Sequence, residues 1–264
     1  MKLGYLGPIG SYSYEASNKY MNKNDELIQY DTILKVVEAL ENNEIQECIV
    51  PLENAIHGSV LDTMDSILEY KDIFIIDEII LDINHILMAK TKDTKVAKIY
   101  SHPQALAQCK TFLNENYYNV EKVPVSSTSY AASLASKESD TACICNYTCK
   151  DLYNLEVISD KIQDIEKNQT KFIVLSKVKN TRKTNKTSVV FSTKDEPGAL
   201  YKILGLFSMA EINLTKIESR PAKTKLGEYM FFVDIQGDEK DENIEVAFRK
   251  IESFCEEFRV IGSY

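Results

Sequence analysis

The stretch KFIVLSKVKNTRKTNKTSVVFST, residues 171–193, decides how the chain is divided. It contains two apolar, β-branched runs of the kind found in buried strands. Between them, KVKNTRKTNK (177–186) is polar and basic and has no apolar period, which indicates a linker. Residues 1–180 and 181–264 are therefore predicted to form two domains.

Upstream of the linker, short apolar runs alternate with helical patterns. This alternation predicts an α/β domain built around a mostly parallel sheet. Strands are expected at 2–6, 47–52, 73–81, 97–100, 122–125, 141–145, 156–159 and 171–176. Helices are expected near 13–23, 32–42, 59–69, 103–116, 128–138 and 146–153.

Downstream of the linker, the patterns follow the order β-α-β-β-α-β. A strand at TSVVFST (187–193) precedes a helical stretch with proline at its start, and two further strands, a helix and a last strand follow. This order is typical of a ferredoxin-like module.

The chain has 264 residues and a formal net charge of −9 at pH 7. This negative balance argues against nucleic acid and against an anionic membrane surface as partners. No apolar run approaches the ~18 residues that cross a membrane, and MKLGYLGPIG (1–10) lacks the pattern of a secretory signal peptide. We therefore expect a cytoplasmic protein.

Signals for cofactors and metals are weak. Gly4, Gly7 and Gly10 do not have the spacing of a dinucleotide-binding fingerprint, so NAD is not expected. The stretch CICNYTC (143–149) has no second pair of ligands at zinc spacing, and its cysteines are expected to be small buried residues. The three histidines of the chain are too sparse for a metal site.

Four strand-to-helix junctions of the first domain share a chemistry of small and polar residues. The junctions are YLGPIGSYSYEASNKY (5–20), VPLENAIHGSVLDTM (50–64), IYSHPQALAQC (99–109) and VPVSSTSYAASLA (123–135). Carboxyl ends of parallel strands meet at one edge of a sheet, where backbone N–H groups favour anions. All four arginines lie after residue 181, so an anion bound by the first domain must rely on N–H groups, hydroxyls and lysine.

Polar residues also stand at the start of the apolar strand near residue 172. Asn168, Thr170 and Lys171 precede FIVL, and such a cluster is expected to face a ligand. In the second module, Gly198 follows Pro197 at a helix start, where N–H groups can meet a carboxylate. Acceptors on a nearby strand could meet an ammonium, so this module is expected to bind a free amino acid.

Taken together, these motifs resemble those of prephenate dehydratases that carry a C-terminal ACT regulatory domain. The resemblance rests on GPIGSYS (7–13), VPLENAIHGSV (50–60), SHPQALAQC (101–109), IQDIEKNQTKF (162–172), PGALYKIL (197–204), and INLTKIESRP (212–221) before KTKLGEY (223–229). It covers essentially the whole chain.

The resemblance implies a fold and an activity. The fold would be a two-lobed catalytic domain similar to type II periplasmic binding proteins, with lobes of about 1–80 plus 160–180 and of 81–159. The activity would be a hydro-lyase reaction of phenylalanine biosynthesis, from prephenate to phenylpyruvate, without metal or organic cofactor. L-phenylalanine would be the allosteric effector of a homodimer or homotetramer.

The resemblance also assigns residues to sites. Thr170 would be catalytic. The residues that would bind substrate are Ser11, Asn54, Gln104, Lys171 and Phe172. The residues that would bind the effector are Gly198, Ala199, Leu200, Asn213, Leu214, Glu218, Ser219, Arg220 and Pro221.

The chain departs from the family pattern at four places. At the first, Ser11-Tyr12-Ser13 stands where Thr-Phe-Ser is usual, and the hydroxyl at residue 11 is kept. Ala55 stands where serine is usual, Lys171 where arginine is usual, and Glu211 where glycine usually ends a helix. Lysine offers a flexible point charge in place of a bidentate fork, which weakens carboxylate binding. Two alternatives therefore stay open: an arogenate dehydratase, whose substrate carries an ammonium, and a phenylalanine sensor with weakened catalysis. A transport-type binding protein is disfavoured because an export signal is not recognisable.

Overall fold

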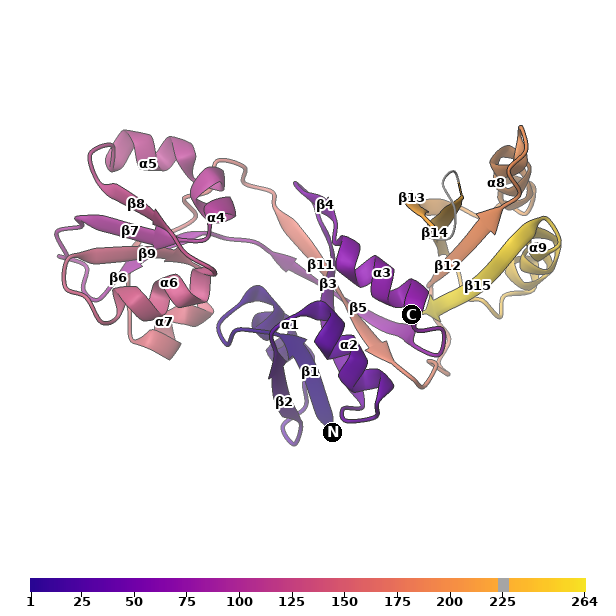
Figure 1. Cartoon of the computed structure of the whole chain (residues 1–264), viewed down its shortest axis with the longest axis horizontal. Coiled ribbons are helices and arrows are strands. Elements are labelled where there is room, and N and C mark those ends of the chain that lie inside the picture. The colour runs from indigo at the N-terminus through magenta and orange to yellow at the C-terminus, as the bar shows by residue number, and fades with distance from the viewer. Residues whose placement is uncertain (223–227) are drawn as a thin grey trace. The chain divides into compact units, whose positions relative to one another are not determined.

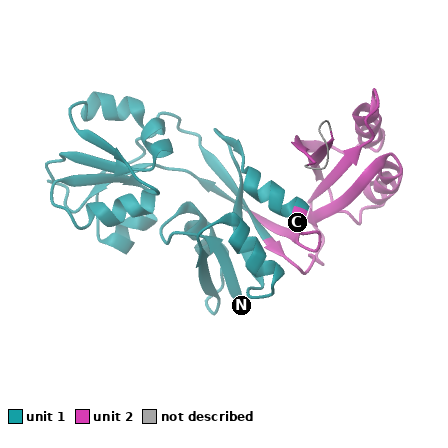
Figure 2. Ribbon diagram, viewed as in Figure 1, with its two compact units in different colours: residues 1–68, 79–174 teal, residues 69–78, 175–264 magenta. Residues whose placement is uncertain are grey.

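The computed structural model describes residues 1–222 and 228–264. These residues form two compact units, which Figure 2 distinguishes by colour. Unit 1 comprises residues 1–68 and 79–174, and unit 2 comprises 69–78 and 175–264. The second unit thus includes two segments, 69–78 and 175–180, that the sequence assigned to the first domain.

Unit 1 contains part of a mixed sheet with its covering helices. The strands of this region are β1 (Lys2–Leu6), β2 (Glu26–Tyr30), β3 (Glu47–Asn54), β4 (Gly58–Ser59), β5 (Phe74–Asp82) and β11 (Gln169–Ser176). Their order is β5-β11-β3-β1-β2, with β4 folded back onto β3, and β1 runs parallel to both of its neighbours (Figure 1). The helices are α1 (Tyr12–Tyr20), α2 (Ile33–Glu41) and α3 (Leu61–Glu69).

The second sheet of unit 1 lies within residues 86–159. Its strands are β6 (Ile86–Ala89), β7 (Lys98–Ser101), β8 (Glu121–Pro124), β9 (Thr141–Cys145) and β10 (Glu156–Ser159), in the order β10-β6-β9-β7-β8. Its helices are α4 (Pro103–Gln108), α5 (Lys110–Asn116), α6 (Thr128–Ala135) and α7 (Thr148–Tyr153). A separate apolar core packs on each face of this sheet.

Two sequence predictions about this region need correction. The second sheet is mixed, because β6 pairs antiparallel with both β9 and β10, whereas a mostly parallel sheet was expected. The expected helix at 103–116 is two helices that break at Cys109, whose φ of −114° and ψ of 19° are not helical. The cysteines of CICNYTC (143–149) are buried in one of the apolar cores, as predicted.

Unit 2 contains a four-stranded antiparallel sheet with two helices. Its elements in chain order are β12 (Lys186–Thr193), α8 (Ala199–Met209), β13 (Leu214–Pro221), β14 (Tyr229–Gln236), α9 (Glu242–Glu252) and β15 (Cys255–Ser263). The predicted β-α-β-β-α-β order is confirmed, and the strands lie in the order β13-β14-β12-β15. Five residues of the KTKLGEY motif (223–229) lie outside the described residues.

Helix α8 ends in a Schellman motif with glutamate at the left-handed position. Glu211 has a φ of 56°, the N–H of Ile212 donates to Phe207 O at 3.0 Å, and the N–H of Glu211 donates to Ser208 O at 3.0 Å. The helix therefore ends as a glycine-capped helix would, although a side chain is present. A left-handed conformation costs an L-residue about 1–2 kcal/mol relative to the right-handed one.

We therefore expect Glu211→Gly to stabilise unit 2. The free energy of unfolding should rise by about 1 kcal/mol, which raises the melting temperature by about 2–4 °C. Thermal unfolding followed by circular dichroism measures this. Glu245→Gly in the first turn of α9, where the backbone is right-handed, is the matched control and should lower stability by up to about 1 kcal/mol. An unchanged or lower melting temperature for Glu211→Gly would show that the position is not strained.

Candidate active site

A pocket of about 370 Å³ lies in unit 1, within the usual range for small-molecule sites. Residues from all four strand-to-helix junctions line it, together with residues at the start of β11. The junctions therefore meet, although not at the edge of a single sheet as expected, because two of them follow β1 and β3 and the other two follow β7 and β8 of the second sheet. The lining residues are Leu6, Ser11, Tyr12, Pro51, Asn54, Val60, Ile83, His85, His102, Gln104, Ala105, Gln108, Ser126, Ser127, Thr128, Asn168 and Thr170.

Asn54 is the central hydrogen-bonding residue of this pocket. Its Oδ1 accepts from the backbone N–H groups of Ile56 at 3.0 Å and His57 at 3.1 Å. Its Nδ2 lies 2.8 Å from Asn168 Oδ1, 2.9 Å from Thr170 Oγ1 and 3.2 Å from the backbone oxygen of Gln169. The side chain thus ties the end of β3 to the start of β11.

These contacts fix the direction of the hydrogen bonds that Asn54 makes. A backbone N–H can only donate, so the atom of Asn54 that faces Ile56 and His57 must be its carbonyl oxygen. Its amide nitrogen then faces β11 and donates there. Thr170 Oγ1 must therefore accept from Asn54, which leaves the Thr170 hydroxyl proton for a group in the pocket.

Two histidines and a glutamine form a second polar chain at the pocket. Gln108 Oε1 lies 2.5 Å from His85 Nε2, and Gln108 Nε2 lies 2.9 Å from His57 Nε2. Burial lowers the pKa of His85, and the Gln108 contact opposes this shift in part. The His85 imidazole is therefore neutral near pH 7, and Gln108 holds its orientation.

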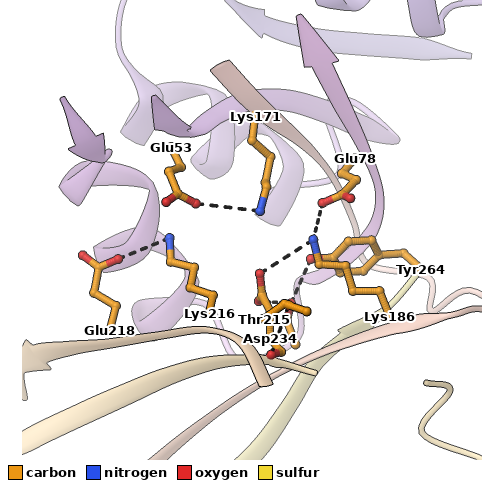
Figure 3. Close-up of polar contacts among 10 residues, drawn as sticks. Glu53, Glu78, Lys171, Lys186, Thr215, Lys216, Glu218, Asp234 and Tyr264 are labelled. Atoms are coloured by element: carbon orange, nitrogen blue, oxygen red, sulfur yellow. Dashed lines mark hydrogen bonds and ion pairs between the residues drawn. The ribbon is translucent and has the colours of Figure 1, made fainter. Parts of the chain in front are cut away.

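Lys171 lies on the other side of β11 from Thr170, because successive side chains of a strand point to opposite faces. Its Nζ is 3.7 Å from Glu53 Oε2, and the two side chains are drawn in Figure 3. Neither residue lines the pocket. Glu53 and Lys171 thus pair on one face of β3 and β11, while Asn54 and Thr170 pair on the other.

This geometry leads to a prediction for Lys171→Gln. An ion pair at partly exposed positions contributes about 0–1 kcal/mol, so we expect KM for the substrate to stay within about threefold, the same effect as for Glu53→Gln. Steady-state kinetics of both variants measures this. A KM more than tenfold higher for Lys171→Gln alone would show that Lys171 binds substrate directly, as the sequence predicted.

Comparison with known proteins agrees with this picture. Residues 3–180 match the family model described as "Prephenate dehydratase", and residues 187–253 match the "ACT domain" model. The chain belongs to the prephenate dehydratase family. Prephenate dehydratases of Lactococcus lactis subsp. lactis and Methanocaldococcus jannaschii are 36% and 37% identical to it. These alignments cover 100% and 98% of this chain and 97% and 96% of the relatives.

A solved structure extends the comparison. The prephenate dehydratase of Arthrobacter aurescens, in complex with L-Phe, superposes with a TM-score of 0.90 at 29% identity. The match covers 100% of this chain and 90% of that one. The predicted fold class, an α/β prephenate dehydratase domain followed by an ACT domain, is confirmed.

Family resemblance also predicted that Gln104, Ser11 and Phe172 bind substrate, and the structure places these three residues in different surroundings. Gln104 lines the pocket near the start of α4. Ser11 also lines it, but its hydroxyl caps α1, accepting from Tyr14 N at 3.2 Å and donating to Leu6 O at 3.3 Å. Phe172 is only 2% exposed and is not among the lining residues. Substrate binding by each of the three stays a prediction.

Several pocket residues were not assigned to the site from sequence. They are Tyr12, His85, His102, Gln108, Ser126, Thr128 and Asn168. The junction chemistry pointed to Ser126, Thr128 and His102, and Asn168 stood in the polar cluster before β11. Tyr12 donates to Asn84 O at 2.7 Å across 72 residues, a contact for which a single sequence holds no signal.

The ACT domain has a pocket of its own, of about 350 Å³. Gly198, Ala199 and Leu200, three of the predicted effector residues, line it near the start of α8, where Gly198 has a φ of 82°. The remaining six residues lie on or just before β13, outside the lining set. These are Asn213, Leu214, Glu218, Ser219, Arg220 and Pro221.

Strand β13 lies at the edge of the ACT sheet, with β14 as its neighbour. Glu218 pairs with Lys216 on the same face, at 3.2 Å between Oε2 and Nζ (Figure 3). Just before the strand, Asn213 Nδ2 donates to Gln236 Oε1 at 3.0 Å. An edge strand of eight residues offers a row of backbone groups to a further chain.

No group of three or more metal-ligating side chains is found among the described residues. Likewise, within residues 1–222 and 228–264 no helix is long and apolar enough to cross a membrane.

Proposed function

We propose that unit 1 converts prephenate to phenylpyruvate in the pocket that contains Thr170. The observation that carries this proposal is the hydrogen bond from Asn54 Nδ2 to Thr170 Oγ1 at 2.9 Å. It makes the Thr170 oxygen an acceptor and so directs its proton to a ligand. Prephenate carries a hydroxyl on the ring carbon opposite its ring carboxylate, and this hydroxyl must depart.

In the reaction, the bond from the ring to the carboxylate breaks and its electron pair enters the ring. The bond to the ring hydroxyl breaks at the same time, and the oxygen leaves with that bond's electron pair. Carbon dioxide and hydroxide are released, hydroxide takes up a proton, and the ring becomes aromatic. Because aromatisation drives the reaction, the protein must mainly orient the substrate and assist the departing oxygen.

Thr170 supplies that assistance. Its hydroxyl donates a hydrogen bond to the departing oxygen and relays a proton to it, then regains a proton from water. A free alcohol is a poor acid, so the effect comes from position and from the hydrogen bond that Asn54 donates to the same oxygen. Ala55, at the position where serine is usual, is not one of the pocket residues, and its N–H bonds to Gln169 O at 2.8 Å.

Substrate carboxylates are bound by neutral donors in this proposal. Of the described residues, those that line the pocket include no Lys and no Arg. Amide and hydroxyl donors from Gln104, Ser126 and Thr128 face the pocket. Such groups bind anions without a cation when several converge on one site.

Arogenate is the less suitable substrate. Its side chain carries an ammonium, which calls for a carboxylate partner. The lining residues that the structure describes include no Asp and no Glu. Prephenate, with a keto group at that position, is therefore favoured.

A sensor without turnover is also disfavoured. Lys171 would favour a sensor only if an arginine at this position contacted the substrate. Lys171 lies on the face of β11 away from the pocket and pairs with Glu53, so its identity does not change the pocket lining. The Asn54–Thr170 pair is complete.

Turnover of the purified chain tests the activity. Phenylpyruvate formation is followed with prephenate and separately with arogenate, each corrected for the enzyme-free reaction. We expect kcat/KM to be at least tenfold higher for prephenate. Equal or better use of arogenate would reverse the substrate assignment, and no turnover from folded protein would support the sensor.

L-phenylalanine is proposed as the feedback effector, bound at the ACT domain. The pocket lined by Gly198, Ala199 and Leu200 has backbone N–H groups near a helix start, where a carboxylate fits. The A. aurescens relative was solved in complex with L-Phe. Pairing of the β13 edge with a second copy would bring the remaining predicted residues to the site, so a homodimer or a homotetramer is proposed. The cytoplasmic location stays a prediction.

Inhibition and assembly are tested together. Initial rates are measured over a range of phenylalanine concentrations, and mass is measured by sedimentation with and without phenylalanine. Inhibition by a species of two or four chains supports the proposal. A monomer that is inhibited would show that the effector site is complete within one chain.

A further inference from the structure

Asn168 is buried beside the catalytic threonine, and half of its amide has no partner. The residue is 2% exposed and lines the pocket. Its Oδ1 accepts from Asn54 Nδ2 at 2.8 Å. Its Nδ2 has no hydrogen-bond partner among the described residues. Buried amide nitrogens almost always have an acceptor, so this one indicates a partner that comes from outside the chain.

The orientation of the Asn168 amide follows from the contacts of Asn54. Two backbone N–H groups fix Asn54 Oδ1 as an acceptor, so Asn54 Nδ2 is the atom facing β11. The Asn168 atom that meets this donor must be an oxygen. The NH₂ group of Asn168 is therefore the end left over, and exchanging its nitrogen and oxygen would place two NH₂ groups against each other.

The result is a pair of donors that one residue organises. Asn54 Nδ2 donates both to Asn168 Oδ1 and to Thr170 Oγ1, which makes each of these atoms an acceptor. The hydrogens left for a ligand are the amide hydrogens of Asn168 and the hydroxyl hydrogen of Thr170. Both residues line the same pocket and are separated by a single residue of the chain.

We propose that Asn168 is a second catalytic donor, whose amide binds the departing hydroxyl oxygen of the substrate together with Thr170. This inference rests on the proposed dehydration of prephenate. The oxygen is a neutral hydroxyl in the ground state and gains a full negative charge as its bond to the ring breaks. Donors placed in advance around such an oxygen stabilise the transition state more than the substrate.

Asn168→Asp separates this role from a merely supporting one. Aspartate has nearly the same shape and keeps the oxygen that accepts from Asn54, but it replaces the NH₂ donor with a second oxygen. If Asn168 served only to hold Asn54, this variant would keep its activity. We expect kcat near pH 7.5 to fall about 100-fold, with KM within about threefold.

The pH profile of the same variant gives a second measurement. A protonated aspartate carries an O–H donor, so acidification restores a donor at position 168. Relative to the wild type, kcat of Asn168→Asp should therefore rise as the pH falls. A variant with unchanged kcat near pH 7.5, or with a loss that acid does not reverse, would overturn the proposal. A loss carried by KM alone would also overturn it, since it would place the amide on a ground-state group.

Asn168→Ala guards against a folding failure of the buried aspartate. It removes the donor without adding charge, and we again expect kcat about 100-fold lower with KM within about threefold. A kcat within threefold of wild type would contradict the inference. Asn146→Ala is the matched control, because Asn146 is 1% exposed and its amide donates to Glu15 Oε2 at 3.3 Å, outside the pocket. Its kcat should be unchanged.

Wild-type turnover of prephenate is measured in the same experiment. If the wild type does not turn over prephenate, the proposed function fails. If the wild type is active and both Asn168 variants keep its kcat, only the role of Asn168 fails.

Discussion

Thr170→Ala should lower kcat for prephenate by about 100-fold or more, equivalent to about 2.7 kcal/mol of transition-state stabilisation. The variant removes the proton donor that Asn54 directs into the pocket and leaves β11 otherwise intact. KM should change little, because the hydroxyl acts on an oxygen whose charge develops only as its bond breaks. Steady-state rates of phenylpyruvate formation measure both quantities.

Two further substitutions at this position are the controls. Thr170→Val keeps the shape of the side chain without its hydroxyl and should be as slow as Thr170→Ala. Thr170→Ser keeps the hydroxyl and should retain more than a tenth of wild-type kcat. If Thr170→Val were as active as the wild type, Thr170 would have no part in the chemistry.

Asn54→Asp should be at least as damaging as the loss of the Thr170 hydroxyl, although it changes a single atom. The carboxylate still accepts from the N–H groups of Ile56 and His57, so the turn after β3 is kept. Its second oxygen now faces both Thr170 and Asn168 as an acceptor. The Thr170 hydroxyl and the turned Asn168 amide then donate to it instead of to the substrate. We expect kcat to fall about 100-fold or more.

A double variant tests whether Asn54 acts through Thr170. Residues that act as a unit give non-additive losses, so Asn54→Asp combined with Thr170→Ala should be little slower than Asn54→Asp alone. Asn18→Asp is the matched control, because the Asn18 amide donates to Tyr14 O at 2.9 Å within α1. It should retain wild-type kcat. Fully additive losses would mean that Asn54 contributes independently of Thr170.

Sequence patterns predicted the order of elements in the ACT domain. They missed β2 and β6, and the reason is physical for each. The residues of β6 (Ile86–Ala89) are all buried, so this four-residue run shows no alternation and is too short to distinguish from a loop. The residues of β2 (Glu26–Tyr30) are partly exposed and mixed in character. Both strands depend on their neighbours in a sheet.

The sequence likewise predicted part of the candidate site. Strand ends and helix starts pointed to the junctions that line the pocket, because each of the two sheets presents the carboxyl ends of its parallel strands at one edge. Family resemblance pointed to Thr170, Asn54 and Gln104. Successive side chains of a strand point to opposite faces, so Thr170 and Lys171 cannot both face the same ligand from β11. Their grouping as one polar cluster was therefore wrong for Lys171.

Other features of the site depend on contacts that no local pattern encodes. The Asn54–Asn168 bond joins residues 114 positions apart, and the Gln108–His57 contact joins residues 51 positions apart. Only the folded chain shows that Asn54 donates to both Asn168 and Thr170. The direction of those hydrogen bonds, and with it the two free donors, becomes clear at that level.

The most direct test of the account is a structure of Thr170→Ala with prephenate bound. The slow variant retains substrate, and Asn168 remains in place to mark the position of the departing oxygen. We predict the ring hydroxyl oxygen within about 3.2 Å of Asn168 Nδ2, facing the space that the Thr170 hydroxyl occupied. A prephenate carboxylate at this position, or prephenate bound outside the pocket, would contradict the account.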